Sequence, residues 1–276
     1  MKKEKIMVYK KVIFLLVVST ILLFILAFFS IDKKENTVLA SNTHSILNIR
    51  SILEKFYDIS NEQTKNTPLK RDLSKYQGKK LIAFTFDDGP NSVTTNLLLD
   101  GLEKYDAKVT FFISGTRISK NKEVIKKAYL EGHDIGSHTY SHKNLFRLKN
   151  SNILNEINKN NDSIREIIGS NPIYLRPPYG NVNKRINGLT DMYVICWDID
   201  SLDWKYKNRN KIKDRILKTA HDGGIVLLHD IYEESIMGAF MAMEELEKQG
   251  YVFVTISEMV ELKGITLDSD DVYYHF

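Results

Sequence analysis

The sequence predicts a single barrel-like α/β domain of about seven parallel strands joined by crossover helices. Between about residues 80 and 260, short apolar runs typical of buried strands alternate with longer amphipathic segments typical of helices. Strands that alternate with helices form parallel sheets, because each helix carries the chain back to the start of the next strand. Aspartate, histidine and arginine side chains follow five of these strands, at the edge where α/β barrels carry their chemistry.

The predicted elements follow one another regularly along the chain. Strands are expected at residues 81–86, 108–113, 134–136, 173–176, 193–197, 224–228 and 251–255. Helices are expected in the stretch that carries Leu98, Leu102 and Tyr105 on one face, and around residues 122–131, 153–168, 211–220 and 234–248, with a final turn after the last strand. The first two strands are almost entirely apolar, as in a sheet covered on both faces. Gly132 and Gly169 stand where two of the helices end, in positions suited to a left-handed cap.

The amino-terminal end contains the most apolar segment. Residues 12–31 form an uncharged run of 20 residues, long enough at about 1.5 Å per residue to cross a hydrocarbon core of about 30 Å. Five lysines precede this run, whereas the charges that follow it balance. By the positive-inside rule we expect a single-pass anchor in the cell membrane, with residues 1–11 in the cytoplasm and the remainder outside the cell. A signal peptide cleaved after Ala40, which would give a secreted protein, and a buried soluble helix are the alternatives.

The composition limits the possible function classes. The chain has 276 residues, 43% hydrophobic and 27% charged, as in a globular protein. Much of the net charge of +4 comes from residues 1–11, so we predict no nucleic-acid partner. The single cysteine, Cys196, excludes an intramolecular disulfide and a cysteine-based zinc site. Any metal site must therefore use histidine, aspartate or glutamate.

The chain divides into segments of different character. After the anchor we expect a polar extracytoplasmic spacer over residues 32–77, a catalytic domain over 78–265 and a tail over 266–276. No obligate protein partner is predicted.

Two segments suggest a metal site. Asp87 and Asp88 end the first strand, where adjacent carboxylates repel each other and lose hydration unless a cation or donors meet them. His138 and His142 are four residues apart, a spacing that puts both imidazoles on one face of a helical turn. Taken singly, these residues could be a turn-capping aspartate and solvated histidines. Together, two histidines and one aspartate form a common ligand set for zinc and similar divalent ions.

Three further segments carry polar residues after strands. Residues 176–180, RPPYG, form a stiff loop that either presents Arg176 to a site or simply holds a salt bridge. Residues 200–204, DSLDW, offer two carboxylates and Trp204, which is either a sugar-stacking wall or part of the core. Residues 227–229, LLH, end a buried strand with His229, which on its own could be a cap or a core residue.

These segments together resemble the motifs of the NodB-like polysaccharide deacetylases, carbohydrate esterase family 4. In the family's order, residues 85–90, 138–142, 176–180, 200–204 and 227–229 match its first to fifth motifs. The resemblance covers about residues 80–260 and implies a distorted (β/α) barrel of about seven strands. With the predicted anchor, the chain resembles the membrane-anchored bacterial peptidoglycan deacetylases.

The resemblance implies a role for each matched residue. Asp88, His138 and His142 would bind one divalent metal, with zinc favoured and cobalt or nickel as alternatives. Asp87 would be the general base for a water that the metal activates, and His229 the general acid that protonates the departing amine. Arg176 would orient Asp87, and Asp203 would orient His229, with Asp200 less favoured for that task.

The same resemblance implies a substrate pocket and a substrate. The Tyr179 backbone N–H would hold the oxyanion, and Tyr179, Trp204 and Leu227 would line the pocket. For an exported, tethered enzyme we expect an N-acetylated cell-wall glycan, first of all N-acetylglucosamine of peptidoglycan. N-acetylmuramic acid, poly-N-acetylglucosamine, chitin-type oligosaccharides and O-acetylated xylan are alternatives. A non-catalytic protein that binds wall glycan is the hypothesis from another functional class.

Overall fold

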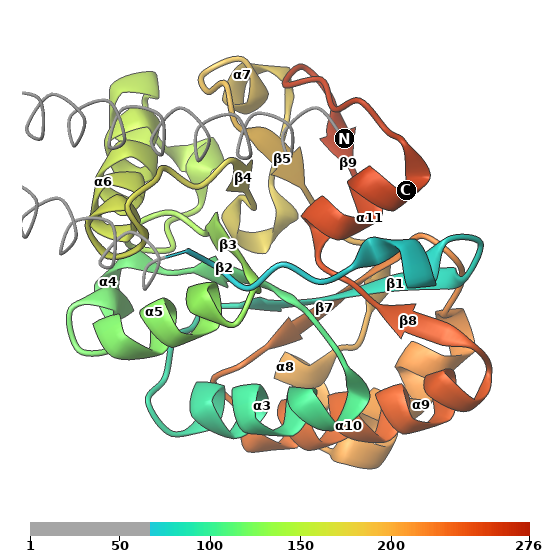
Figure 1. Ribbon diagram of the computed structural model, residues 1–276. Helices are drawn as coiled ribbons and strands as arrows, with labels where there is room; N and C mark the ends of the chain where they lie inside the picture. The colour runs from blue at the N-terminus through green and yellow to red at the C-terminus, as the bar shows by residue number, and fades with distance from the viewer. Residues whose placement is uncertain (1–66) are drawn as a thin grey trace, which may run out of the picture. The chain divides into compact units, whose positions relative to one another are not determined.

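The computed structural model describes residues 67–276 (Figure 1). The predicted anchor over 12–31 and most of the predicted spacer lie outside the described residues. Within residues 67–276, no helix has both the length and the apolar character needed to cross a membrane.

Nine strands form one parallel sheet in the described region, in the order β6-β7-β1-β2-β3-β4-β5-β9, with β8 paired to the first residues of β1. They are β1 (Lys80–Asp87), β2 (Thr110–Ile113), β3 (Asp134–Ser137), β4 (Tyr174–Leu175), β5 (Tyr193–Ile195), β6 (Ile199–Asp200), β7 (Gly224–His229), β8 (Tyr251–Phe253) and β9 (Val272–Tyr273). The seven predicted strands are all present. The two additional strands, β6 and β9, have two residues each, too few to leave an alternating pattern in the sequence.

The parallel α/β class is confirmed, but the sheet is a curled half-barrel with edges at β6 and β9. Its helices are α3 (Thr94–Leu102), α4 (Gly115–Ile118), α5 (Lys122–Leu130), α6 (Asn150–Ile168), α7 (Lys184–Asn187), α8 (Asp203–Tyr206), α9 (Arg209–Thr219), α10 (Glu233–Lys248) and α11 (Ile256–Lys263). The long helices occupy the predicted segments, and α6 ends at Gly169 in the left-handed conformation, as expected. The short helices α4, α7 and α8 were not predicted, because a single turn shows no periodicity.

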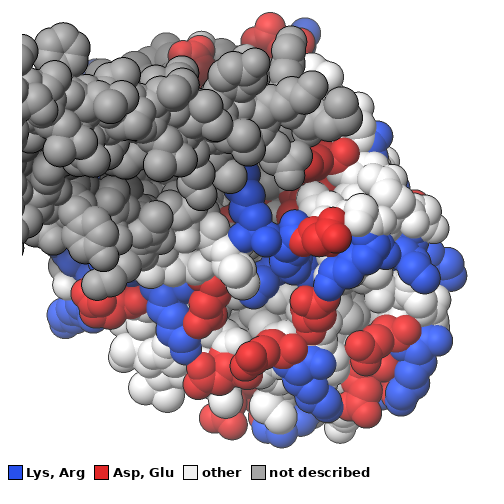
Figure 2. Space-filling view, viewed as in Figure 1, with Lys and Arg blue, Asp and Glu red and all other residues white. Residues whose placement is uncertain are grey.

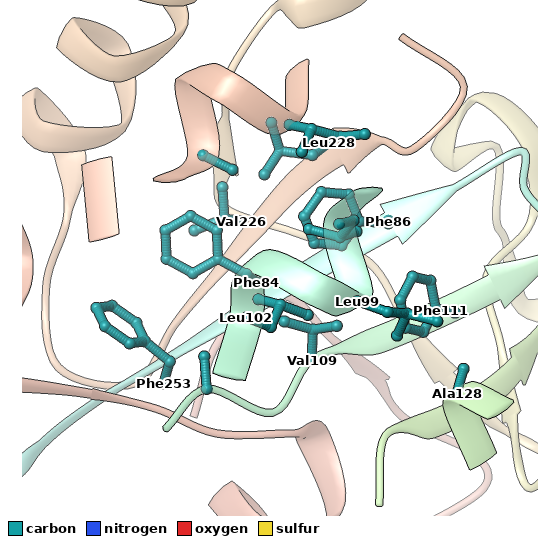
Figure 3. Close-up of a cluster of buried hydrophobic side chains, with 14 of the residues drawn as sticks. Phe84, Phe86, Leu99, Leu102, Val109, Phe111, Ala128, Val226, Leu228 and Phe253 are labelled. Carbon is teal, nitrogen blue, oxygen red and sulfur yellow. The ribbon is translucent and has the colours of Figure 1, made fainter. Parts of the chain in front are cut away.

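The two faces of β1 pack against different clusters. Phe84 and Phe86 are fully buried beneath α3, beside Val226 and Leu228, their partners in register on β7 (Figure 3). Burying one such phenylalanine contributes about 1.5–3 kcal/mol. Leu81 and Ala83 belong to the cluster on the other face of the sheet, because successive strand side chains alternate.

That alternation also places the polar residues of β1. Thr85 and Asp87 have the same parity as Leu81 and Ala83, and therefore face the inside of the half-barrel. Thr85 and Asp87 are 0% and 2% exposed, so the strand carries a carboxylate into the interior at its carboxyl end.

Described residues on either side of segment 78–265 also contact the sheet domain. At one end, Arg71 forms an ion pair with Glu258 of α11. At the other end, β9 pairs with β5, and the amide of Phe276 donates to the Gly223 carbonyl at 2.9 Å. These attachments use side-chain contacts of Arg71 and backbone hydrogen bonds, which leave no periodic signal in the sequence. On the face shown in Figure 2, acidic and basic side chains are interspersed.

Candidate active site

The carboxyl ends of β1 and β7 lie side by side and bring two functional residues together. Asp87 and His229 are the last residues of these strands and are partners in register. His138 follows β3, and Arg176 follows β4. Because carboxyl ends of parallel strands meet at one edge of the sheet, residues far apart in the sequence converge there.

One aspartate and two histidines form a possible metal site. Asp88 Oδ1 lies 3.3 Å from His142 Nε2 and 3.7 Å from His138 Nε2. One ligand atom from each of the three residues lies within 4.8 Å of the others. Nδ1 of His138 is 2.7 Å from the Arg176 carbonyl, which can only accept, so Nδ1 carries the proton and Nε2 is free to bind a cation. Two imidazole nitrogens and one carboxylate oxygen fit a divalent transition metal, and they leave positions for water and substrate.

The two histidines do not lie on a helical turn, contrary to the sequence prediction. Thr139 and His142 both have positive φ, 63° and 54°, so the segment is a strained loop. Both ligands nevertheless converge because Glu156 of α6 holds the loop between them. Its carboxylate accepts from the Ser141 amide at 2.7 Å and from the Ser141 hydroxyl at 2.6 Å. Burial alone raises a carboxyl pKa, but the Ser141 hydrogen bonds hold the pKa of Glu156 below its usual value.

Arg176 crosses the interior of the half-barrel to reach Asp87. It is fully buried, and Nη1 donates to Asp87 Oδ1 at 2.8 Å and to Thr85 Oγ1 at 2.6 Å. Its other nitrogens donate to the carbonyls of Ile195 and Cys196. Each guanidinium nitrogen therefore has a hydrogen-bond partner, and the bond from Arg176 fixes the orientation of the Asp87 carboxylate.

Asp203 holds His229 in a similar way. Asp203 is fully buried, and its Oδ1 lies 2.8 Å from His229 Nδ1. Asp200, the less favoured candidate, instead accepts from the Leu202 amide at 2.9 Å. The carboxylate and imidazole predicted to act together are thus in contact.

Two of the three histidines at the site, His138 and His229, have pKa values shifted in opposite directions. Burial lowers the pKa of His138, which favours the neutral imidazole that a metal requires. Burial also disfavours the charged form of His229, but the hydrogen bond and charge of Asp203 prevail and raise its pKa to about 9. At neutral pH His229 therefore carries a proton that it can donate, whereas neutral His138 has a lone pair that can bind a cation.

The three expected substrate-binding residues differ in exposure. Tyr179 and Trp204 are 63% and 51% exposed, so Trp204 is not a core residue. The Tyr179 ring lies edge-on to His142, with centroids 4.8 Å apart. Leu227 is almost fully buried in β7, two residues before His229.

Several supporting residues were not singled out from the sequence. Glu156 and Asn160 interrupt the apolar face of α6, and a charged residue on such a face is a signal that could have been followed. Asp230 is buried against Gly89, where an added Cβ would lie 2.2 Å from Asp230 Oδ1. Thr95 donates a hydrogen bond to Asp230. Burial raises the pKa of Asp230 to about 7.

Comparison with known proteins agrees with this arrangement. Residues 74–193 match the family model described as polysaccharide deacetylase. The chain is 42% identical over 185 residues to the peptidoglycan-N-acetylmuramic acid deacetylase PdaC of Bacillus subtilis. In the structure of PdaC, 94% of that chain aligns with 70% of this one, with a TM-score of 0.66 and 41% identity. The chain belongs to the polysaccharide deacetylase family.

Other members of the polysaccharide deacetylase family are also similar. The chain is 37% identical over 188 residues to the peptidoglycan-N-acetylglucosamine deacetylase PgdA of Listeria monocytogenes. The alignments cover 67% and 68% of this chain, but only 40% of PdaC and 40% of PgdA. A family 4 acetyl xylan esterase from Clostridium thermocellum, solved with a cobalt ion, aligns with a TM-score of 0.68 at 29% identity over 71% of this chain and 98% of that one.

Proposed function

We propose that this protein is a metal-dependent hydrolase that removes N-acetyl groups from the amino sugars of peptidoglycan. The observation that carries the proposal is the convergence of the Asp88, His138 and His142 ligand atoms beside two buried pairs, Asp87–Arg176 and His229–Asp203. Hydrolysis of an amide needs a base for the attacking water and an acid for the departing amine. The pairs are suited to these two tasks.

Each pair prepares one proton transfer. Asp87, held by Arg176, accepts a proton from the attacking water. His229, kept charged by Asp203, donates a proton to the nitrogen of the departing amine. A divalent ion at Asp88, His138 and His142, with zinc favoured and cobalt or nickel as alternatives, would polarise the acetamide carbonyl and acidify water. The Tyr179 backbone N–H would hold the developing oxyanion, and Tyr179, Trp204 and Leu227 would line the sugar and acetyl sites.

N-acetylglucosamine is our first candidate for the sugar, because PgdA carries that specificity in its name. N-acetylmuramic acid is the second, because PdaC, at 42% identity, is named for it.

The decisive experiment compares wall glycan before and after treatment with the full chain. Muramidase fragments would be analysed by mass spectrometry, with Asp87→Asn as the inactive control. We expect the loss of one acetyl group on one type of amino sugar, together with free acetate. Release of acetate from O-acetylated xylan but not from peptidoglycan would contradict the proposed substrate, and binding without release would favour a glycan-binding protein.

We further propose that residues 12–31 anchor the enzyme in the cell membrane, with the deacetylase domain outside. Support comes from the uncharged run and the lysines before it. The test is cell fractionation with protease treatment of intact protoplasts. The domain should stay with the membrane and be digested from outside, whereas release into the medium would indicate cleavage after Ala40.

A further inference from the structure

A second group of metal-ligating side chains lies at the opposite end of β7 from His229. Asp198 immediately precedes β6, His275 follows β9, and His221 lies just before β7. Because β6 and β9 are the two edges of the curled sheet, the three residues meet where those edges approach each other. An isolated antiparallel bridge links Gly224, the first residue of β7, to His275 there.

The carboxylate-to-histidine distances of this group are similar to those of the Asp88 site, but its three ligand atoms, unlike those of the Asp88 site, do not all lie within 4.8 Å of one another. Both histidines face a single carboxylate oxygen, Asp198 Oδ2, which lies 2.9 Å from His221 Nε2 and 3.6 Å from His275 Nδ1. The corresponding distances at Asp88 Oδ1 are 3.3 and 3.7 Å. Ligand atoms that share a metal at about 2.0–2.1 Å lie at such separations.

The hydrogen bonds around the group also resemble those of a metal site. His221 Nδ1 is 3.0 Å from the Thr219 carbonyl, as His138 Nδ1 is 2.7 Å from the Arg176 carbonyl. A carbonyl only accepts, so Nδ1 of His221 carries the proton, and in the neutral ring the Nε2 lone pair points at the Asp198 carboxylate. Two acceptors at 2.9 Å need a proton or a cation between them. The second carboxylate oxygen of Asp198 is fixed by the Ile225 amide at 3.0 Å.

We propose that Asp198, His221 and His275 bind a second divalent transition metal, separate from the catalytic site, which ties the two edges of the half-barrel together. Two imidazoles and one carboxylate favour Zn²⁺, Ni²⁺ or Cu²⁺ over Mg²⁺ or Ca²⁺. The ring centroids of His221 and His275 are 6.2 Å apart, against 5.0 Å for His138 and His142. A rotation of the His275 side chain would bring its ring nitrogen within reach of a metal held by Asp198 and His221. The 64% exposure of this side chain leaves room for the rotation.

Zinc stoichiometry in the metal-stripped full chain tests the proposal. Equilibrium dialysis against micromolar Zn²⁺, followed by elemental analysis, should give two equivalents for the parent protein. His221→Ala/His275→Ala should bind one equivalent and keep its rate of acetate release, which shows that the fold is intact. His138→Ala/His142→Ala should also bind one equivalent, but at the second site.

Thermal unfolding gives an independent result, because a ligand that binds only the native state raises Tm. In the His138→Ala/His142→Ala background, Zn²⁺ should raise Tm, and replacing His275 as well should abolish the rise. One equivalent in the parent, or two in His221→Ala/His275→Ala, would overturn the proposal. A Tm that responds to pH but not to Zn²⁺ would show that a proton, not a metal, joins His221 to Asp198. The zinc counts and the Tm shifts do not depend on whether the protein deacetylates peptidoglycan.

Discussion

Asp203 binds His229 at two points. One carboxylate oxygen lies 2.8 Å from the imidazole Nδ1, and the other accepts from the His229 backbone amide at 2.7 Å. Ser235 donates to this second oxygen at 2.6 Å. The ring therefore has a fixed orientation, and the adjacent negative charge keeps its proton in place.

Replacing Asp203 by Asn should move the alkaline limit of activity to lower pH. His229 must be protonated to act as an acid, and its pKa is raised to about 9. Activity should therefore persist above neutral pH and fall as pH rises through that pKa. Without the Asp203 charge the fall should begin at lower pH, and kcat at neutral pH should decrease by roughly 10²–10⁴. Asp200→Asn is the matched control, and an unchanged pH–rate profile in Asp203→Asn would contradict the assigned role.

Asp87→Asn and Asp88→Asn should separate catalysis from metal binding. Asp87 is bonded to Arg176, whereas Asp88 supplies the oxygen that faces both histidines. Asp87→Asn should retain the zinc of this site and lose roughly 10²–10⁴ in kcat. Asp88→Asn should lose the zinc as well. Dialysis in the His221→Ala/His275→Ala background counts this site alone, and equal zinc loss in both variants would show that Asp87 is also a ligand.

Arg176→Met should strongly destabilise the fold. Removing one partner of a buried ion pair leaves an uncompensated charge, which costs about 3–5 kcal/mol. Arg176→Lys keeps the positive charge but loses the planar guanidinium that donates to four acceptors. Its free energy of unfolding should therefore lie between those of the parent and Arg176→Met. Urea denaturation measures the free energy of unfolding of both variants. Arg185→Met removes an exposed arginine with three hydrogen bonds and should cost far less. Equal losses for Arg176→Met and Arg185→Met would be inconsistent with this account.

Glu156→Ala should weaken zinc binding although it replaces none of the three metal-ligating residues. Glu156 fixes Ser141, one residue before the ligand His142, and changes outside the ligand set typically cost 10–100-fold in metal affinity. Glu156→Gln should be milder, because its amide oxygen still accepts one hydrogen bond. Competitive titration with a chelating dye gives the affinity. The control is Glu166→Ala, an exposed residue on the same helix, and similar affinities in all of these variants would exclude the positioning role.

Chelation of the metal should abolish acetate release, and Zn²⁺ or Co²⁺ should restore it. Asp88, His138 and His142 are the group of described residues whose ligand atoms lie close enough together to hold an ion as placed. Activity that persists at full rate after complete metal removal, confirmed by elemental analysis, would rule out the mechanism.

Much of this active site was predictable because its residues stand at the ends of apolar strands. The parallel strand topology alone brings three of these residues to one edge of the sheet: Asp87, His138 and His229. The loop between His138 and His142 was mispredicted as a helical turn, because spacing alone cannot show that Glu156, from a later helix, stabilises two left-handed residues. The strands β6 and β9 were missed because two residues show no periodicity.

The sequence by itself determined the order of strands and helices, the metal-ligand types and the family motifs, since these depend on local pattern and residue chemistry. The family resemblance implied the pairs Asp203–His229 and Arg176–Asp87, and the tertiary structure supplies their contacts: Asp203 rather than Asp200 lies against His229, and Arg176 passes through the interior to Asp87. It also brought the last residues of the chain into the sheet beside Asp198 and His221. These contacts join residues distant in sequence, and they follow from how the sheet curls rather than from any pattern within one segment.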